Sequence, residues 1–263
     1  MNFLNLLYFF YYIDLKNYSK HILLTLILIS TVLAFNGKRC NICYGEIESD
    51  YLKDAWDNIF HKEHEKTAEF CESCYRVVSV AITDGGYYLP DNRLICNLCY
   101  QSSVNSYDEA LKILDMTLEY LSNNGINIDS SYIKLNLIFK NEIRFDSNNH
   151  LNYKAFTILN KSESLSSHEI FILKGLPSQE FSSILAHELM HIWIAENNIK
   201  IENELEEYYC NLVARDLYSV DMNLFSSIKQ NSIDIQLDEN KYDSLFIKKN
   251  YTITEIIKHI HGH

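Results

Sequence analysis

The chain alternates between stretches with a clear hydrophobic periodicity and stretches without one. The clearest helical pattern begins at Ser106, which forms a capping-box sequence with Glu109. Tyr107 and four leucines then follow at spacings of four, three, four and three residues, which places them on one face of a helix. Gly125 supplies a stop signal. The pattern predicts an amphipathic helix that opens a folded domain.

Strands and further helices are predicted after this first helix. Segment 132–139 alternates apolar and polar residues, as a half-buried strand does. The predicted strands are Tyr132–Phe139, Tyr153–Leu159 and Glu169–Leu173. Three further helices are predicted. The first begins at Ser182 or Ser183 and carries the sequence ILAHELMHIW, the second covers Glu204–Tyr218, and the third lies near Thr254–His261. This order predicts an α+β fold with helices packed on a short mixed sheet.

Residues 37–104 are rich in cysteine and histidine and have weak periodicity. Such a segment builds little hydrophobic core, so we expect bound metal to hold it. Within it, residues 77–82 and 87–95 flank Asp84, Gly85 and Gly86. The pattern predicts a β-hairpin that turns at these three residues.

The N-terminal segment has two apolar runs at 3–13 and 22–35, separated by a polar stretch. The second run is shorter than the roughly 20 residues of a membrane span but fits the apolar core of a signal peptide. We therefore divide the chain into a leader (1–36), a zinc-binding module (37–104) and a C-terminal domain (105–263). The leader favours secretion or membrane anchoring, with membrane contact through residues 3–35. A cytoplasmic location is the alternative, because reduced thiols suit that compartment.

Composition narrows the classes of function. The chain of 263 residues has only 7 Gly, and no phosphate-binding glycine loop can be written from them. Its formal charge is −12, so we expect no nucleic-acid partner.

The sharpest chemical motif is the H-E-x-x-H sequence at residues 187–191. On a helix, His187 and His191 lie on one face and can bind one zinc ion. Glu188 follows the first ligand directly and can act as the general base toward a water bound to zinc. The strand at Glu169–Leu173 directly precedes this helix, and we expect it to be the sheet edge that pairs with an extended substrate.

A catalytic zinc ion needs a third protein ligand and one open position. The leading candidates are Glu206 and Glu207, on the next predicted helix. Glu202 and Glu204 lie nearby, and spacing alone does not choose between these acids.

Six of the seven cysteines form three C-x-x-C pairs, which zinc sites use and disulfide frameworks do not require. The predicted ligands of one structural zinc are Cys40, Cys43, His61 and His64, where Glu63 or Asp57 can replace a histidine. The predicted ligands of a second structural zinc are Cys71, Cys74, Cys96 and Cys99. The seventh, Cys210, lies in an acidic stretch, and we expect a buried, inert thiol.

The combination of these motifs resembles the DA-one family of LIM-domain metallopeptidases. The resemblance rests on KGLPSQEFSSILAHELMHIW (174–193) and NELEEYYCNLVA (203–214), behind a two-zinc module. It implies a LIM-like finger module followed by a peptidase domain of the gluzincin type, in which Glu207 is the third zinc ligand. The sequence departs from the family at Tyr208, where the family has Gly. It also departs from a typical LIM finger at His64, where such a finger has Cys.

Two hypotheses follow. The first is a zinc endopeptidase that cleaves protein or peptide substrates and binds one catalytic and two structural Zn²⁺ ions. In the second, the protein is a non-catalytic adaptor whose LIM-like module binds a protein partner. Such a partner at the module is compatible with both.

Overall fold

The computed structural model describes residues 37–143, 154–161, 166–220 and 252–260. The predicted leader (1–36) lies outside these residues, as does His261, the last residue of the third predicted helix. None of the helices in the described ranges is long and apolar enough to cross a bilayer.

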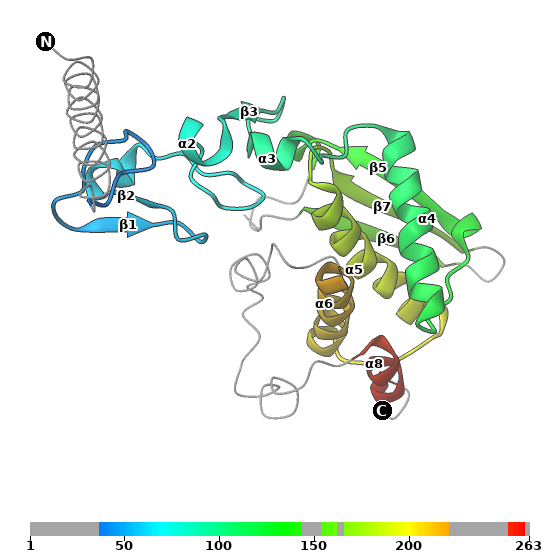
Figure 1. Ribbon diagram of the computed structural model, residues 1–263. Helices are drawn as coiled ribbons and strands as arrows, with labels where there is room; N and C mark the ends of the chain where they lie inside the picture. The colour runs from blue at the N-terminus through cyan, green and yellow to red at the C-terminus, as the bar shows by residue number, and fades with distance from the viewer. Residues whose placement is uncertain (1–36, 144–153, 162–165, 221–251, 261–263) are drawn as a thin grey trace, which may run out of the picture.

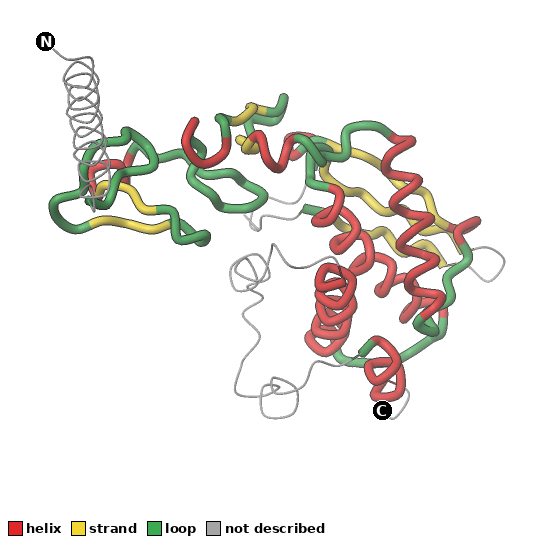
Figure 2. Tube along the Cα trace, in the orientation of Figure 1, coloured by secondary structure: helices red, strands yellow, loops and turns green. Residues whose placement is uncertain are grey.

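Two small hairpins and short helices come first in the chain, and a helix-and-sheet domain follows (Figure 1). The strands are β1 (Tyr51–Lys53), β2 (Ile59–His61), β3 (Gly86–Tyr88), β4 (Leu94–Cys96), β5 (Ile133–Ile138), β6 (Ala155–Lys161) and β7 (Ser166–Leu173). The α-helices are α2 (Val80–Thr83), α3 (Asn97–Tyr100), α4 (Tyr107–Asn123), α5 (Ser178–Glu196), α6 (Asn203–Val220) and α8 (Ile253–Ile260). Short 3₁₀ helices are η1 (Lys62–Lys66), η2 (Ser130–Tyr132) and η3 (Lys140–Glu142). Loops make up much of the N-terminal part, whereas long helices dominate the C-terminal part (Figure 2).

The C-terminal domain is built on a three-stranded sheet in the order β5-β7-β6. β5 runs parallel to β7 and β6 runs antiparallel to it, so the predicted short mixed sheet and α+β class are confirmed. The prediction that the strand directly before the H-E-x-x-H helix forms the sheet edge is wrong. That strand is β7, which lies in the centre with Ile170 and Ile172 fully buried, and β6 is the edge strand on one side. Chain order does not fix strand order, because β6 and β7 pair as a hairpin while β5 joins from the other side.

The predicted amphipathic helix is α4. The Ser106 hydroxyl accepts a hydrogen bond from the backbone N–H of Glu109, and the Glu109 carboxylate accepts one from the backbone N–H of Ser106, which completes the capping box. Gly125 has φ +95°, a left-handed conformation that suits glycine at a helix end. Leu114 and Leu121 are buried and Leu111 and Leu118 pack against the core, as predicted, whereas Tyr107 at the start of the predicted face is 50% exposed.

Helix α5 carries the H-E-x-x-H sequence through the middle of the domain. It begins at Ser178, directly after Pro177, and the predicted start at Ser182 or Ser183 is wrong. Ser183 does not cap the helix, because its hydroxyl donates to the carbonyl oxygen of Ala214 on α6. Buried residues occur all around α5, since α4, α6 and the sheet surround it.

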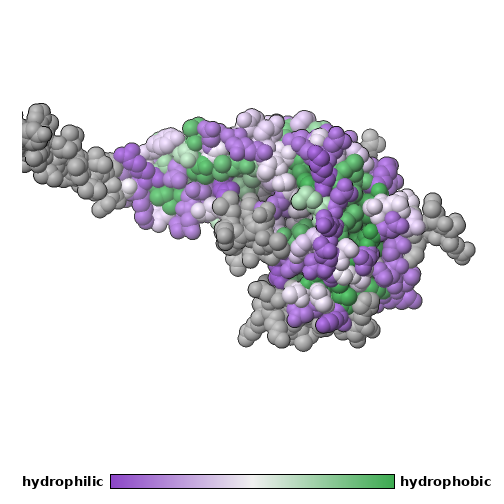
Figure 3. Space-filling model, turned by 45° about the vertical axis from the view of Figure 1, so that its right-hand side comes forward, coloured by the Kyte–Doolittle hydropathy of each residue, from purple (hydrophilic) through white to green (hydrophobic). Residues whose placement is uncertain are grey.

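On the face in Figure 3, hydrophilic residues cover much of this domain.

In the hairpin predicted to turn at residues 84–86, the first strand, at 77–82, is wrong, because the short helix α2 occupies much of this segment. Ser79 instead caps the short helix α2 by accepting a hydrogen bond from the N–H of Ile82, and serine favours this role over a strand position. The observed hairpin pairs β3 with β4 and turns later, where the N–H of Leu89 donates to the carbonyl oxygen of Arg93.

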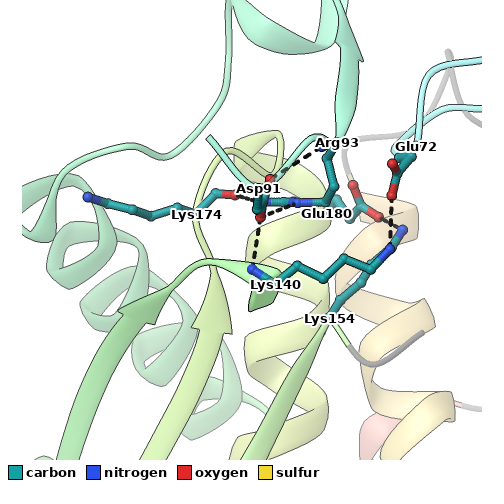
Figure 4. Close-up of polar contacts among 7 residues, drawn as sticks. All are labelled: Glu72, Asp91, Arg93, Lys140, Lys154, Lys174 and Glu180. Atoms are coloured by element: carbon teal, nitrogen blue, oxygen red, sulfur yellow. Dashed lines mark hydrogen bonds and ion pairs between the residues drawn. The ribbon is translucent and has the colours of Figure 1, made fainter. Parts of the chain in front are cut away.

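The N-terminal module contacts the C-terminal domain through a buried polar cluster (Figure 4). The Arg93 guanidinium donates to the Asp91 carboxylate at 2.9 Å and to the carbonyl oxygen of Lys174. Asp91 also accepts the backbone N–H of Lys140 at 2.8 Å. The side chains of Arg93 and Asp91 are 4% and 0% exposed, so this ion pair is enclosed between the two parts of the chain.

Candidate metal centre

Four cysteines from two C-x-x-C turns converge in the module. The ligand atoms of Cys71, Cys74, Cys96 and Cys99 all lie within 4.8 Å of one another, and all four residues are buried. The Sγ atoms of Cys74 and Cys96 are 3.7 Å apart. Zinc–sulfur bonds of about 2.3 Å in a tetrahedron put two sulfurs about 3.8 Å apart, so the group fits zinc. Hydrogen bonds from the other three thiols hold the pKa of Cys71 far below that of a free thiol.

The first group of predicted ligands, which comes earlier in the chain, is more exposed. The ligand atoms of Cys40, Cys43, His61 and His64 also lie within 4.8 Å of one another, and Cys43 is exposed. His61 directs Nδ1 toward Cys43 Sγ at 3.3 Å, and its Nε2 lies 2.9 Å from the carbonyl oxygen of Glu46. Burial raises the pKa of Cys40, but hydrogen bonds from backbone groups outweigh it and lower that pKa to about 7.

The two acids considered as replacements for a histidine in this group do not belong to it. Asp57 pairs with Lys53 at 2.6 Å, and Glu63 is exposed on η1. The structure therefore brings together both predicted ligand sets of the module, and each can hold a metal ion.

The two histidines of the H-E-x-x-H sequence face one another on α5. Their Nε2 atoms are 3.2 Å apart, and both side chains are mostly buried. Glu207 reaches them from α6, with one carboxylate oxygen 3.3 Å from His187 Nε2 and the other 3.4 Å from His191 Nε2. Tetrahedral ligands about 2.0–2.1 Å from a zinc ion lie about 3.3 Å apart. Each carboxylate oxygen of Glu207 thus lies at the spacing of zinc ligands from one of the two histidine nitrogens.

Glu206 contacts the other side of the same imidazole. Its Oε1 lies 2.7 Å from His191 Nδ1, a hydrogen-bond distance. Burial lowers the pKa of His191, but the hydrogen bond that its ring donates to Glu206 and the charge of Glu207 outweigh it and raise that pKa. The contact with His187 lowers the pKa of Glu207 against the effect of its partial burial. The two adjacent acids, which spacing alone did not separate, therefore occupy different positions.

Glu188 belongs to α5 and is buried, with 7% of its surface exposed. Its carboxylate contacts the edge strand β6. Thr157 on β6 donates a hydrogen bond from its hydroxyl to Glu188 Oε2 at 2.6 Å. The Thr157 contact was not predicted. The alternation of β6 carries a weak signal for it, because Thr157 shares the inner face with the buried Ala155.

The C-terminal half of the chain matches a known protein family. Residues 133–261 match the model of the family DA1-like, described as Protein DA1. This part of the chain belongs to the DA1-like family. The resemblance seen in the sequence is thereby confirmed for residues 133–261, and this segment contains the His187, His191 and Glu207 cluster. The searches of curated proteins and of solved structures returned no match.

Cys210 lies close to the two histidines, and the sequence predicted its burial but not this position. Cys210 is a buried thiol, as predicted, and burial raises its pKa well above the ordinary value. Its Sγ nevertheless lies within 4.8 Å of a ring nitrogen of each histidine, which was not predicted. Asn211, which follows Cys210 on α6, leaves its buried Nδ2 without a partner in the described part of the chain.

Proposed function

We propose that this protein is a zinc-dependent endopeptidase of the gluzincin type that hydrolyses peptide bonds of protein substrates. His187, His191 and Glu207 would hold the catalytic zinc, and Glu188 would be the general base. One observation carries the proposal: the two histidine Nε2 atoms lie 3.2 Å apart, and each has a different oxygen of the Glu207 carboxylate 3.3–3.4 Å away, the spacing of tetrahedral zinc ligands.

A zinc ion in this position supplies a Lewis acid that polarises a carbonyl and lowers the pKa of a bound water. The chain supplies the proton acceptor. Thr157 holds Glu188 Oε2 by its hydroxyl, which fixes the carboxylate and leaves Oε1 to accept a proton. Because Glu188 is largely shielded from solvent, its interactions with reacting groups are stronger than they would be in water.

The edge strand provides a way to bind a peptide. Within the described residues, β6 pairs with β7 on one side and presents its other side without a strand partner. An extended substrate can add to such an edge through main-chain hydrogen bonds. Thr157 places this edge directly beside Glu188, so a peptide paired with β6 would pass close to the general base.

The two Cys/His groups would each bind a structural zinc and make the N-terminal module LIM-like. Each group offers four ligands and so leaves no open coordination position, which is typical of structural sites. The module would then present protein substrates or bind a protein partner near the catalytic domain.

The test compares the full chain with a Glu188→Gln variant. We expect wild-type protein to contain three zinc ions and to cleave a peptide library. The variant should keep three zinc ions and lose at least about 100-fold in rate, the contribution typical of a general base. Glu204→Gln, which changes an exposed acid on α6, is the matched control and should stay active. Equal cleavage by wild type and Glu188→Gln would contradict the proposal. Two zinc ions and no cleavage would favour the adaptor.

A further inference from the structure

The imidazole of His191 is contacted by two adjacent carboxylates on opposite ring nitrogens. Glu206 Oε1 lies 2.7 Å from Nδ1, whereas a Glu207 oxygen lies 3.4 Å from Nε2. A neutral imidazole carries one proton and offers its other nitrogen to a metal. A carboxylate at Nδ1 favours the proton there, which leaves the lone pair at Nε2, on the side of His187.

The distances separate the two acids into different roles. Both oxygens of Glu207 lie at the spacing of ligands that share a metal ion, near 3.3 Å from a histidine Nε2. The Glu206 contact is shorter and has the length of a charge-assisted hydrogen bond. Glu206 also faces Nδ1, the nitrogen that points away from the other candidate ligands.

Burial makes the Glu206 contact effective. The side chains of His191 and Glu206 are 16% and 24% exposed, so solvent competes little for this hydrogen bond. Glu207 is more exposed, at 46%, as expected at the open side of a site that admits substrate. Among the described residues, no carboxylate contacts Nδ1 of His187 in the same way. His191 is therefore the histidine of the two whose ring meets a carboxylate of α6 at each nitrogen.

We infer that Glu206 is a positioning residue for the catalytic metal site. It accepts the Nδ1–H hydrogen bond of His191, fixes the ring in the tautomer that presents Nε2, and increases the affinity of the site for zinc without being a ligand. This inference rests on the proposed zinc site. It assigns separate tasks to the two acids of the Glu206-Glu207 pair.

The test measures zinc affinity of the full chain by competition with a chromophoric chelator. A chain with both His187→Ala and His191→Ala serves as the reference for the two structural sites. Loss of a carboxylate that orients a metal-bound histidine typically weakens binding about 10- to 100-fold, and we expect this loss for Glu206→Ala. Glu206→Gln keeps an oxygen that can accept the Nδ1–H bond and should recover most of the affinity. Glu204→Gln should bind like wild type.

Cobalt spectra separate the tasks of the two acids. With Co²⁺ in the third site, Glu206→Ala should keep the wild-type absorption spectrum, because the ligand set is unchanged. Glu207→Gln should alter that spectrum. The inference is overturned if Glu206→Ala binds zinc as tightly as wild type, or if it changes the cobalt spectrum while Glu207→Gln does not. If the affinities follow expectation but no peptide is cleaved, the peptidase proposal fails and the positioning role stands.

Discussion

Ser73 donates a hydrogen bond from its hydroxyl to Glu180, and this contact joins the second cysteine group to the first turn of α5. Ser73 lies inside the turn between Cys71 and Cys74. Glu180 also accepts a hydrogen bond from Lys154, which is mostly buried (Figure 4). The cysteine group and the helix that carries the H-E-x-x-H sequence therefore share one enclosed polar cluster, although Ser73 and Glu180 are 107 positions apart in the chain.

The first prediction concerns Glu180. Replacing it by Ala leaves the Lys154 ammonium without its carboxylate, with only 23% of that side chain exposed. Breaking a buried pair in this way costs about 3 kcal/mol or more in the free energy of unfolding. Urea unfolding of the zinc-loaded chain measures the loss. The control is Lys134→Ala, which breaks an ion pair with Glu169 whose lysine is 64% exposed and should cost less than about 1 kcal/mol. Equal losses for the two variants would show that the Glu180 cluster adds no stability.

The second prediction concerns Thr157, which holds Glu188 from the edge strand. A hydrogen bond to a charged group contributes about 1.5–3 kcal/mol, so its loss should lower kcat/KM by about tenfold or more. Thr157→Val has nearly the same shape but lacks the hydroxyl and should show this loss. Thr157→Ser keeps the hydroxyl and should retain most of the activity. The role of Thr157 is refuted if the two variants are equally active.

The third prediction concerns the order in which the two module sites release metal. Cys43 is exposed and both histidines of its group are partly exposed, whereas the four cysteines of the other group are at most 5% exposed. A chelator should therefore empty the first group while the chain stays folded, and the second group only when the module unfolds. In a chain with both His187→Ala and His191→Ala, which lacks the third site, zinc release with a colorimetric dye gives the two phases, and circular dichroism reports the folding.

Two variants assign these phases. Cys43→Ser should remove the fast phase and Cys74→Ser the slow one. A fast phase that persists in Cys43→Ser and disappears in Cys74→Ser would reverse the assignment and contradict the argument from exposure.

Local elements of the C-terminal domain could be predicted from sequence because each has its own signal. The capping box at Ser106 and the alternation in segment 132–139 depend only on neighbouring residues. Strand order is different, because the central place of β7 depends on pairing with both β5 and β6. The predicted first strand of the module failed because Ser79 favours a helix cap, and a local pattern of apolar residues does not reveal that competition.

The candidate site shows the same division. The spacing of His187 and His191 on one helix predicted their convergence, since four residues make about one turn. The choice between Glu206 and Glu207 needed the packing of α6 against α5, which decides the nitrogen that each carboxylate meets. Thr157 lies 31 residues before Glu188 in the sequence, and the alternation of its strand indicates only the face on which it lies, not the glutamate that it contacts.

The last prediction concerns the pH dependence of the contact between module and domain. Burial raises the pKa of Asp91, but the backbone N–H of Lys140 and the Arg93 guanidinium outweigh it and hold that pKa below the ordinary 3.8. A carboxyl group whose pKa is lower in the folded chain stabilises the fold above its unfolded pKa. That stability is lost as the pH falls from about 3.8 through the folded value.

Comparison of wild type with Asp91→Ala isolates this contribution, because acid removes zinc from both chains alike. Near pH 7 the variant leaves Arg93 buried without its carboxylate, which should cost about 3 kcal/mol of unfolding free energy. Below pH 3.8 the difference between the two chains should shrink, since protonated Asp91 no longer pairs with Arg93. Asp115→Ala, an exposed position on α4, is the control and should change stability by less than about 0.5 kcal/mol at either pH. A difference between wild type and Asp91→Ala that stays constant from neutral to acid pH would mean that the Asp91 charge does not hold the two parts together.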